Sequence, residues 1–499
     1  MPHPRQSDSF ASDRQRTRGT IWVLLITLGA ASLRVFHIGS KSFSPDEAFS
    51  IFLARTGWKA FRHLLLTSEA NMALYYLLLR LWSQISDAPS FVRALSVVPG
   101  VASIPAIYFL GKTLFSRRAG IVSALLLAAN VFHIFYSQEA RSYSLLVLLV
   151  TCSSLFFARY INSRRGADGF WYIFSSAASL YAHFFAVLVL LAQFAAWALL
   201  PRQIRSWSQV RNLIASGAFG LPLAVFMAYQ GTSHMDWVHH SPHMAKEVYH
   251  FFLNLSGSGL KSLMFLLAAA LASRQWCLQR RCDKEGLQGW PFLFVSLWLL
   301  IPILVVLLIS HWKPMFVFRF LIICLPAALL LFGYGLILIR PKWLCFAAVV
   351  VTVCASLIAT KSFYRQSGPS DWKAAIRYLA QNVQAGDMLI FPNPYCRFPF
   401  DYNLRMSGNH LPSIQVKYAD AAVIRDFPAE AHHIWIIDFS REAHRHCETL
   451  PCADGEPHGT ARFRFEHAVR FPGVEIEEFE LSKQVLGKPI NSYPPRIHS

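Results

Sequence analysis

At residues 42–48 the sequence reads SFSPDEA, and this stretch follows the first long apolar run, Ile21 to Val35. Two adjacent carboxylates are costly at the mouth of a membrane helix unless they have a function there. Asp46 is therefore the leading candidate for a catalytic residue, with Glu47 beside it. One structural alternative stays open: the acidic pair is solvated just outside a membrane span, and the aspartate caps a helix that starts near Ala48.

The composition is that of a polytopic α-helical membrane protein. Of the 499 residues, 54% are hydrophobic and 15% are charged, and the mean hydropathy is +0.36. This apolar content exceeds that of an ordinary soluble domain. The net charge of +19 comes from basic residues that are spread through short segments between apolar runs. Such spreading fits the positive-inside rule and argues against a nucleic-acid partner.

The apolar runs predict about eleven transmembrane helices between residues 20 and 360. The N-terminal tail, residues 1–19, is rich in arginine and is expected in the cytoplasm together with basic turns such as Lys112/Arg117/Arg118. A cleaved signal peptide would also fit this basic start, but an uncleaved first helix agrees better with the many spans that follow. After the first run, the predicted spans lie at about 93–111, 119–136, 142–160, 170–183, 185–200, 212–229, 259–273, 291–310, 319–339 and 343–360.

Two interfacial helices are predicted between residues 39 and 92, where the chain is not apolar enough to cross. Aromatic and aliphatic residues recur there at helical spacing, while Arg62 and Arg80 face away. One stripe runs from Trp58 to Leu65 and the other from Met72 to Trp82 and includes Tyr75 and Tyr76. A tilted transmembrane helix remains the alternative for the second stripe, which falls just short of a full span.

Polar residues gather in the loops opposite the basic turns. They are Asp46/Glu47, Gln138 to Arg141, Tyr181 to His183, the histidines from 234 to 243 with Asp236, and His311 to Lys313 with Arg319. These loops are expected to line one cavity. Glu139 and Arg141 alternatively neutralise each other, as intramembrane charges often do. The histidine loop lacks regularly spaced carboxylates, which favours solvated histidines over a metal site.

Residues 361–499 have a different character and predict a small α/β domain outside the cytoplasm. Ser370 is expected to cap a helix from Asp371, and strands are predicted at 387–391, 413–417, 434–439, 463–470 and 474–481, with a helix-like stretch at 420–425. No cysteine pair has the spacing of a zinc site. In an oxidising compartment, two of Cys396, Cys447 and Cys452 are predicted to form a disulfide, with Cys447–Cys452 favoured.

Several of these stretches resemble bacterial members of the glycosyltransferase C superfamily. The resemblance is to the family 39-like proteins that include the protein O-mannosyltransferases and the lipid A aminoarabinose transferase, and it extends in order over nearly the whole chain. The matching stretches are Asp46-Glu47, LYYLLLR at 74–80, YSQEARSY at 136–143, YAHF at 181–184, Arg319-Phe320 ahead of Pro326, Asp371-Trp372 and Gly386-Asp387. In place of the His-Pro-Pro triplet of many relatives, this chain has Asn71-Met72-Ala73.

The resemblance implies a transferase that passes a sugar, with inversion, from a polyprenyl phosphate to an acceptor hydroxyl on the outer side of the bacterial inner membrane. Asp46 suits the general base, because a hydroxyl is a weak nucleophile. Cations stabilise the phosphate leaving group. The candidates for that role are Arg141, Arg319 and Lys313, while Tyr75, Tyr76 and His183 are further substrate-binding candidates.

Three questions stay open at this level. Glu47 and Glu139 either orient the sugar or the base or bind a divalent metal, and no obligatory metal or other cofactor is expected. His183 has a structural role as its alternative. The acceptor is a lipid, a glycan or a protein. A flippase for lipid-linked sugars is the rival function, although no internal repeat of the kind found in transporters is visible, and a non-catalytic envelope scaffold is the third reading.

Overall fold

The computed structural model describes residues 6–230, 243–257, 259–282, 288–366, 368, 370–412, 415–418, 433–439 and 462–482. The chain divides into two compact units. The membrane unit comprises Met1–Ser40 and Ser50–Gln366, and the C-terminal unit comprises Lys41–Phe49 and Ser367–Ser499. The short segment 41–49, which the sequence places in the membrane part, thus groups with the tail.

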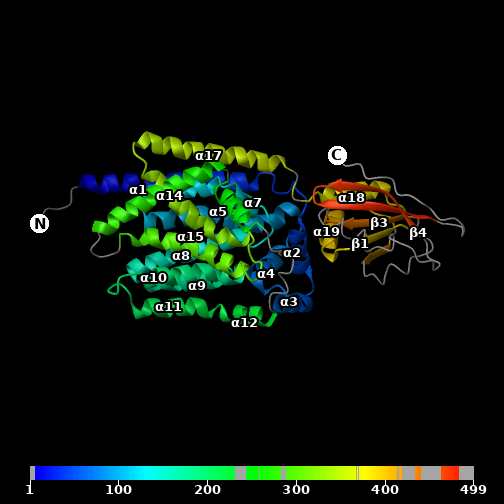
Figure 1. Cartoon of the computed structure of the whole chain (residues 1–499), viewed down its shortest axis with the longest axis horizontal. Coiled ribbons are helices and arrows are strands. Elements are labelled where there is room, and N and C mark those ends of the chain that lie inside the picture. The colour runs from blue at the N-terminus through cyan, green and yellow to red at the C-terminus, as the bar shows by residue number, and fades with distance from the viewer. Residues whose placement is uncertain are drawn as a thin grey trace. The chain divides into compact units, whose positions relative to one another are not determined.

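The membrane unit is built of helices (Figure 1). Their bounds are α1 Gln6–Val35, α2 Pro45–Arg55 (which begins in the C-terminal unit), α3 Trp58–Thr67, η1 Ala70–Met72, α4 Ala73–Trp82, α5 Pro89–Leu114, α6 Arg117–Ala128, α7 Val131–Ser137, α8 Tyr143–Ser163, α9 Gly166–Ala182, α10 Ala186–Ala198, α11 Trp207–Ala218, α12 Leu221–Gln230, α13 Met244–Ser256, α14 Gly259–Cys282, α15 Trp290–Ser310, η3 Phe320–Cys324, α16 Leu325–Ile337 and α17 Lys342–Arg365. Helices α3 and α4 lie where the two aromatic stripes predict them.

Five spans in the described part of the chain are long and apolar enough to cross a membrane: α5, α8, α15, Phe320–Ile337 and α17. Two bent pairs, α6–α7 and α13–α14, raise the number to seven if each is one span. The polytopic helical fold is therefore confirmed, while the count of eleven stays a prediction. The predicted span 212–229 is two helices, because the chain turns at Gly220, whose N–H donates to the carbonyl of Gly217.

Polar side chains join α8, α9 and α10, which lie next to one another (Figure 1). The amide of Gln193 on α10 donates to Ser153 and Ser154 on α8, and its oxygen accepts from the hydroxyl of Tyr172 on α9. The Ser153 hydroxyl also contacts that of Ser176 at 2.8 Å. In a lipid environment such interhelical hydrogen bonds contribute about 0.6–2 kcal/mol each.

Helices α5 and α6 approach each other through two glycines. A Cβ atom added to Gly111 would lie 2.8 Å from the Cα atom of Gly120. Any larger side chain would separate the two helices, and small residues at crossings are what membrane helix pairs use to bring their backbones together.

The break between α6 and α7 is stabilised by a buried arginine, Arg34 of α1. The pair bends by 61° there, and the bend leaves backbone carbonyls of α6 without helical partners. The Arg34 guanidinium donates to the carbonyls of Leu127 and Ala128 at 3.1 and 3.0 Å and lies 2.6 Å from Nδ1 of His133. The side chain of Asn130 caps α7 by accepting from the N–H of His133.

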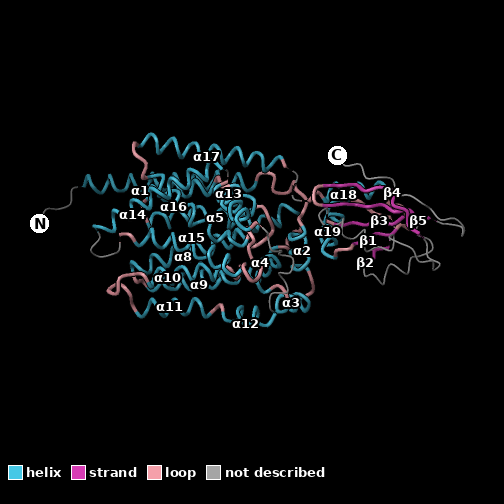
Figure 2. Tube along the Cα trace, in the orientation of Figure 1, coloured by secondary structure: helices cyan, strands magenta, loops and turns pink. Residues whose placement is uncertain are grey.

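The C-terminal unit is an α/β fold, as predicted (Figure 2). Its sheet has the order β2-β1-β3-β5-β4, with β2, β1 and β3 parallel and β5 and β4 antiparallel. The bounds are α18 Trp372–Asn382, β1 Met388–Phe391, η4 Pro394–Cys396, α19 Arg397–Ser407, β2 Gln415–Tyr418, β3 His433–Asp438, β4 Arg462–Phe471 and β5 Val474–Ser482.

Helix α18 packs one face on this sheet. Trp372, Ile376 and Leu379 recur at helical spacing and share a core with Trp435 and Ile437 of β3. The N-cap is Asp371, whose carboxylate accepts from the N–H of Ala374, and not Ser370 as predicted. The reason is that Asp371 adopts the non-helical cap conformation, which puts its own side chain over the first turn.

Helix α19 was not predicted from the sequence, and two predictions lie outside the described residues. They are the helix-like stretch at 420–425 and the Cys447–Cys452 bridge. Cys396 is buried, and its thiol donates to the carboxylate of Asp438 at 3.6 Å. Asp236 and the histidines at 234, 239 and 240 also fall outside the described part of the chain.

Candidate functional site

The acidic pair lies in the first turn of α2. The helix begins at Pro45, earlier than the predicted start near Ala48, because Ser44 forms a capping box with Glu47. The Ser44 hydroxyl accepts from the N–H of Glu47 at 3.3 Å, and the Glu47 carboxylate accepts from the N–H of Ser44 at 3.0 Å. Proline suits the first helical position, where its missing N–H would have no partner. Glu47 is buried by this arrangement, whereas Asp46 is partly exposed.

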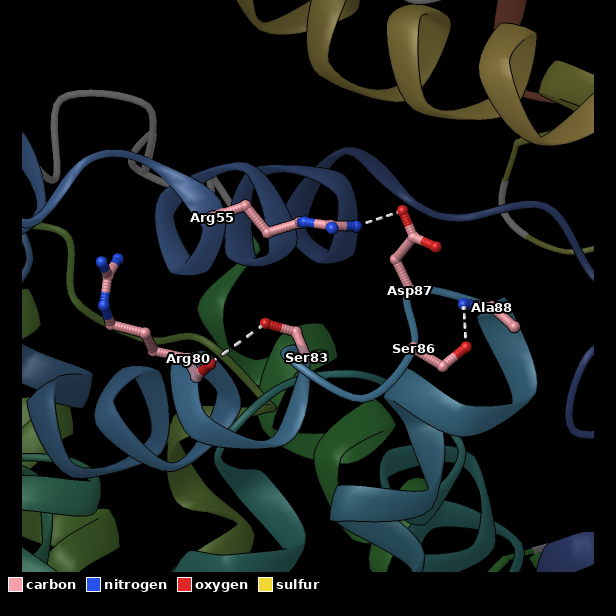
Figure 3. A network of polar contacts seen from close by, with 6 residues as sticks. All are labelled: Arg55, Arg80, Ser83, Ser86, Asp87 and Ala88. Carbon is pink, nitrogen blue, oxygen red and sulfur yellow. Dashed lines mark hydrogen bonds and ion pairs between the residues drawn. The ribbon is translucent and has the colours of Figure 1, made fainter.

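The other end of α2 is anchored by two arginines, Arg80 and Arg55. The guanidinium of Arg80 donates to the carbonyls of Ala54 and Thr56 at 3.0 and 2.6 Å, which satisfies the C-terminus of the helix. The same group lies 4.8 Å from the ring centroid of Phe61. As Figure 3 shows, Arg55 pairs with Asp87 in the loop before α5. These contacts fix where α2 ends in the membrane unit.

Arg141 is the centre of a polar cluster in the membrane unit. Its side chain is buried and donates to two hydroxyls, those of Ser50 on α2 at 3.4 Å and of Tyr76 on α4 at 3.1 Å. The Tyr76 hydroxyl in turn donates to the carboxylate of Glu69 at 3.1 Å. Tyr76 thus accepts from a cation and donates to an anion, which fixes its hydroxyl in one orientation.

Tyr75, which precedes Tyr76 on α4, contacts the same cluster through Ser96. Its hydroxyl lies 2.8 Å from that of Ser96 on α5, and Ser96 donates to the backbone carbonyl of Arg141 at 3.1 Å. Ser144 on α8 donates to the carbonyl of Ser96. The backbone that carries Arg141 is therefore tied to α4, α5 and α8 together.

His183 lies between α9 and α10, outside the helices that are long enough to cross a membrane. It is completely buried, and its Nε2 is 3.4 Å from the amide nitrogen of Asn71. The amide oxygen of Asn71 accepts from the N–H of Phe184 at 2.9 Å. Burial, together with the positive charges of Arg141 and Arg319, lowers the pKa of His183 to about 3. The imidazole is therefore neutral at physiological pH.

The remaining predicted residues lie in the loops around this cluster. Arg319 is half-buried at the start of η3, with its guanidinium 5.7 Å from the ring centroid of Phe320, and that ring also lies 4.8 Å from His183. Glu139 is half-buried two residues before Arg141, and its carbonyl accepts from the N–H of Arg141. Lys313 is half-buried in the loop after α15. Arg141, Arg319 and His183 form one electrostatic group.

Four members of the cluster escaped the sequence analysis: Ser50, Glu69, Asn71 and Ser96. Glu69 carried a usable signal, because it is the lone acidic residue between residues 48 and 86 and lies two helical turns before Tyr76. Asn71 was noted only as a departure from the His-Pro-Pro triplet. In the structure its amide oxygen accepts from the N–H of Phe184, in the turn that contains His183. Within the described ranges, no group of three or more His, Cys, Asp or Glu residues is arranged to hold a metal ion.

Comparisons with known proteins agree with this architecture. Residues 70–229, about a third of the chain, match the family model described as dolichyl-phosphate-mannose-protein mannosyltransferase. The crystal structure of ArnT from Cupriavidus metallidurans in the apo state is similar with a TM-score of 0.56 and 11% identity, over 92% of this chain and 98% of ArnT. The chain has the glycosyltransferase C fold. Its alignment with ArnT covers both units.

A second solved structure with this glycosyltransferase C fold is the apo oligosaccharyltransferase of Archaeoglobus fulgidus. It matches with a TM-score of 0.52 and 11% identity, over 87% of this chain and 71% of the archaeal chain. ArnT has also been solved bound to undecaprenyl phosphate, and that structure matches with a TM-score of 0.53. A search of curated protein sequences finds no significant match.

Proposed function

We propose that the protein is a membrane glycosyltransferase that moves a sugar from a polyprenyl phosphate to an acceptor hydroxyl, with Asp46 as the general base. The observation that carries the proposal lies in helix α2. Asp46 precedes Ser50 by four residues and so shares its helix face, and the Ser50 hydroxyl accepts from the buried Arg141. Helix α2 thus carries the Asp46 carboxylate and contacts the buried Arg141. This arrangement suits Asp46 as the general base and Arg141 as a ligand of the donor phosphate.

The cation cluster suits a phosphate leaving group. Arg141 donates to the hydroxyls of Ser50 and Tyr76, and hydrogen bonds from a guanidinium to a phosphate are roughly twice as strong as bonds between neutral groups. The donor phosphate is proposed to bind Arg141, with Arg319 and Lys313 as further ligands. Charge builds up on the phosphate as the glycosidic bond breaks, so these cations act mainly in the transition state.

The proton moves from the acceptor to Asp46. The acceptor oxygen attacks the anomeric carbon from the face opposite the phosphate, its proton passes to the Asp46 carboxylate, and the phosphate departs as an anion, which inverts the anomeric configuration. Glu139 is proposed to orient the sugar, and the phenols of Tyr75 and Tyr76 to fix the position of Arg141. No metal is required in this scheme. Basic turns in the cytoplasm would place the reaction on the outer face of a bacterial inner membrane.

The proposal is tested by the release of free polyprenyl phosphate from a panel of polyprenyl-phosphate sugars, by the purified protein with envelope acceptors, with and without chelator. Asp46→Asn should lower turnover by several orders of magnitude, because the variant lacks the general base that removes the acceptor's proton. Asp401→Asn is the matched control, because Asp401 is an exposed aspartate in α19 paired with Arg397. Turnover by Asp46→Asn at the wild-type rate would contradict the assignment of Asp46 as the general base. Transbilayer movement of donor without phosphate release would favour the flippase.

A further inference from the structure

The segment that carries Asp46 packs against the C-terminal domain. Residues 41–49 group with residues 367–499, more than 300 positions later in the sequence. Ser42 lies at the N-terminus of α18: its hydroxyl accepts from the N–H of Lys373 at 3.1 Å and lies 3.5 Å from the carboxylate of Asp371. The first turn of α18 therefore gives one of its unpaired N–H groups to this segment.

An aromatic stack provides the second attachment. Phe43 is buried, and its ring is nearly parallel to that of Tyr402 on α19, with 4.2 Å between the centroids and 6° between the planes. The guanidinium of Arg405 lies 5.6 Å from the centroid of the Tyr402 ring. Such stacked pairs contribute about 0.5–1.5 kcal/mol beyond the burial of their area.

A third attachment follows Asp46. The ring of Phe49 meets that of Phe398 edge to face at 5.2 Å and lies 6.2 Å from that of Tyr395. Asp46 thus lies between two anchoring residues: Phe43 contacts α19, and Phe49 contacts both η4 and α19. Between them the capping box of Ser44 and Glu47 makes the first turn of α2 rigid.

We infer that the C-terminal domain sets the position of the Asp46 carboxylate, with Phe43 and Tyr402 as the principal positioning residues. This inference rests on the proposed function, in which Asp46 is the base. A general base must lie within hydrogen-bond reach of the proton that it removes, and a displacement of about 1 Å can lower a rate by about 100-fold. The C-terminal domain is then a component of the chemical step.

The test combines turnover with amide hydrogen exchange of residues 43–55. Tyr402→Ala and Phe43→Ala should each lower kcat by about 10- to 100-fold and leave the KM for the donor within about twofold, because neither residue binds the donor phosphate. Exchange of the 43–55 amides should accelerate. The double variant should be no worse than either single variant, because both changes remove the same contact.

Two controls separate positioning from general damage. Tyr402→Phe keeps the stacked ring and should retain the wild-type kcat. Tyr378→Ala removes a tyrosine from the same domain whose ring packs near Trp435 and Phe471 instead of Phe43. It should leave kcat and the exchange of residues 43–55 unchanged. A fall in kcat in Tyr378→Ala equal to that in Tyr402→Ala would overturn the inference, as would unchanged exchange in Tyr402→Ala.

The exchange measurement does not depend on the reaction. If the wild type transferred no sugar, the proposed function would fail, while faster exchange in Tyr402→Ala would still establish the attachment. If the wild type were active and Tyr402→Ala kept its kcat, the positioning role would fail alone.

Discussion

One buried arginine, Arg34 of α1, reaches the break between α6 and α7, and another, Arg141, lies in the loop before α8. The two differ in the kind of partner that they bind. Arg34 donates to backbone carbonyls of α1 and α6. Arg141 donates to the hydroxyls of Ser50 and Tyr76. Backbone carbonyls in a membrane helix have no alternative donor, whereas a hydroxyl can turn to another partner. The comparison indicates that Arg34 maintains the fold, whereas Arg141, which contacts side chains of α2 and α4, is the candidate for a contact with substrate.

Arg34→Met should give the largest effect and break the fold. The carbonyls of Leu127 and Ala128 would lose their charged donor inside an apolar environment, at a cost of about 3 kcal/mol or more. Yield, monodispersity and thermal unfolding of the purified protein measure the result. Arg34→Lys is the control, and it should be intermediate, because one ammonium group keeps the charge but not the planar fork. A stable, active Arg34→Met protein would show that Arg34 is no structural residue.

Arg141→Met should leave the fold intact and remove the transfer reaction. We expect turnover to fall by about 100-fold or more, the usual result of removing one charge-stabilising group from a transition state. The midpoint of thermal unfolding should stay close to that of the wild type. Both quantities are measured on the same preparation. Wild-type turnover in the folded variant would move the phosphate site elsewhere in the molecule.

The dependence of folding stability on pH tests the neutral state of the buried His183, which lies close to Arg141. Its pKa in the folded protein is about 3, below the ordinary value, so the unfolded chain takes up a proton first as the pH falls below about 6.5. Stability should therefore fall by about 2 kcal/mol between pH 6.5 and 5. His183→Asn should abolish that part of the acid sensitivity, which unfolding curves at the two pH values measure.

Glu47→Gln should give the smallest effect. The amide oxygen of glutamine can still accept from the N–H of Ser44, so the capping box survives, and we expect turnover within about threefold of the wild type. Ser44→Ala, which removes the cap itself, should cost about 1 kcal/mol of stability. Should Glu47→Gln be as inactive as Asp46→Asn, Glu47 would have to be assigned a role in the reaction itself.

Local sequence patterns predicted much of the fold. Apolar runs located α5, α8, α15 and α17, and alternating residues located β3, β4 and β5, because both signals depend on near neighbours. The breaks were missed where a few polar or small residues interrupt an apolar run, as at Asn130 and Gly220. Helix α19 was missed because Pro399 lies within it, and a proline usually argues against a helix interior.

The candidate site was predicted in part. Polar residues in the loops opposite the basic turns drew attention to Arg141 and His183, and the resemblance to the glycosyltransferase C superfamily implied substrate-binding roles for these two and for Tyr75 and Tyr76. Their partners could not be inferred, because Ser50, Asn71 and Ser96 are common small polar residues whose contacts lie 45 to 113 positions away in the sequence. The contact of Phe43 with Tyr402 is longer in range still. No local sequence pattern indicates such a pairing.

The buried Arg34 also has a consequence for biogenesis. Its carbonyl partners lie 93 and 94 residues later in the chain, and at about 5–20 residues per second a ribosome needs about 5–20 s to synthesise that length. If α1 enters the membrane before α6 is made, the arginine can extend toward the interface, where its charge stays hydrated. We therefore expect the last turn of α1 to reach its final depth only after α6 has arrived, so that the first helix completes its insertion late.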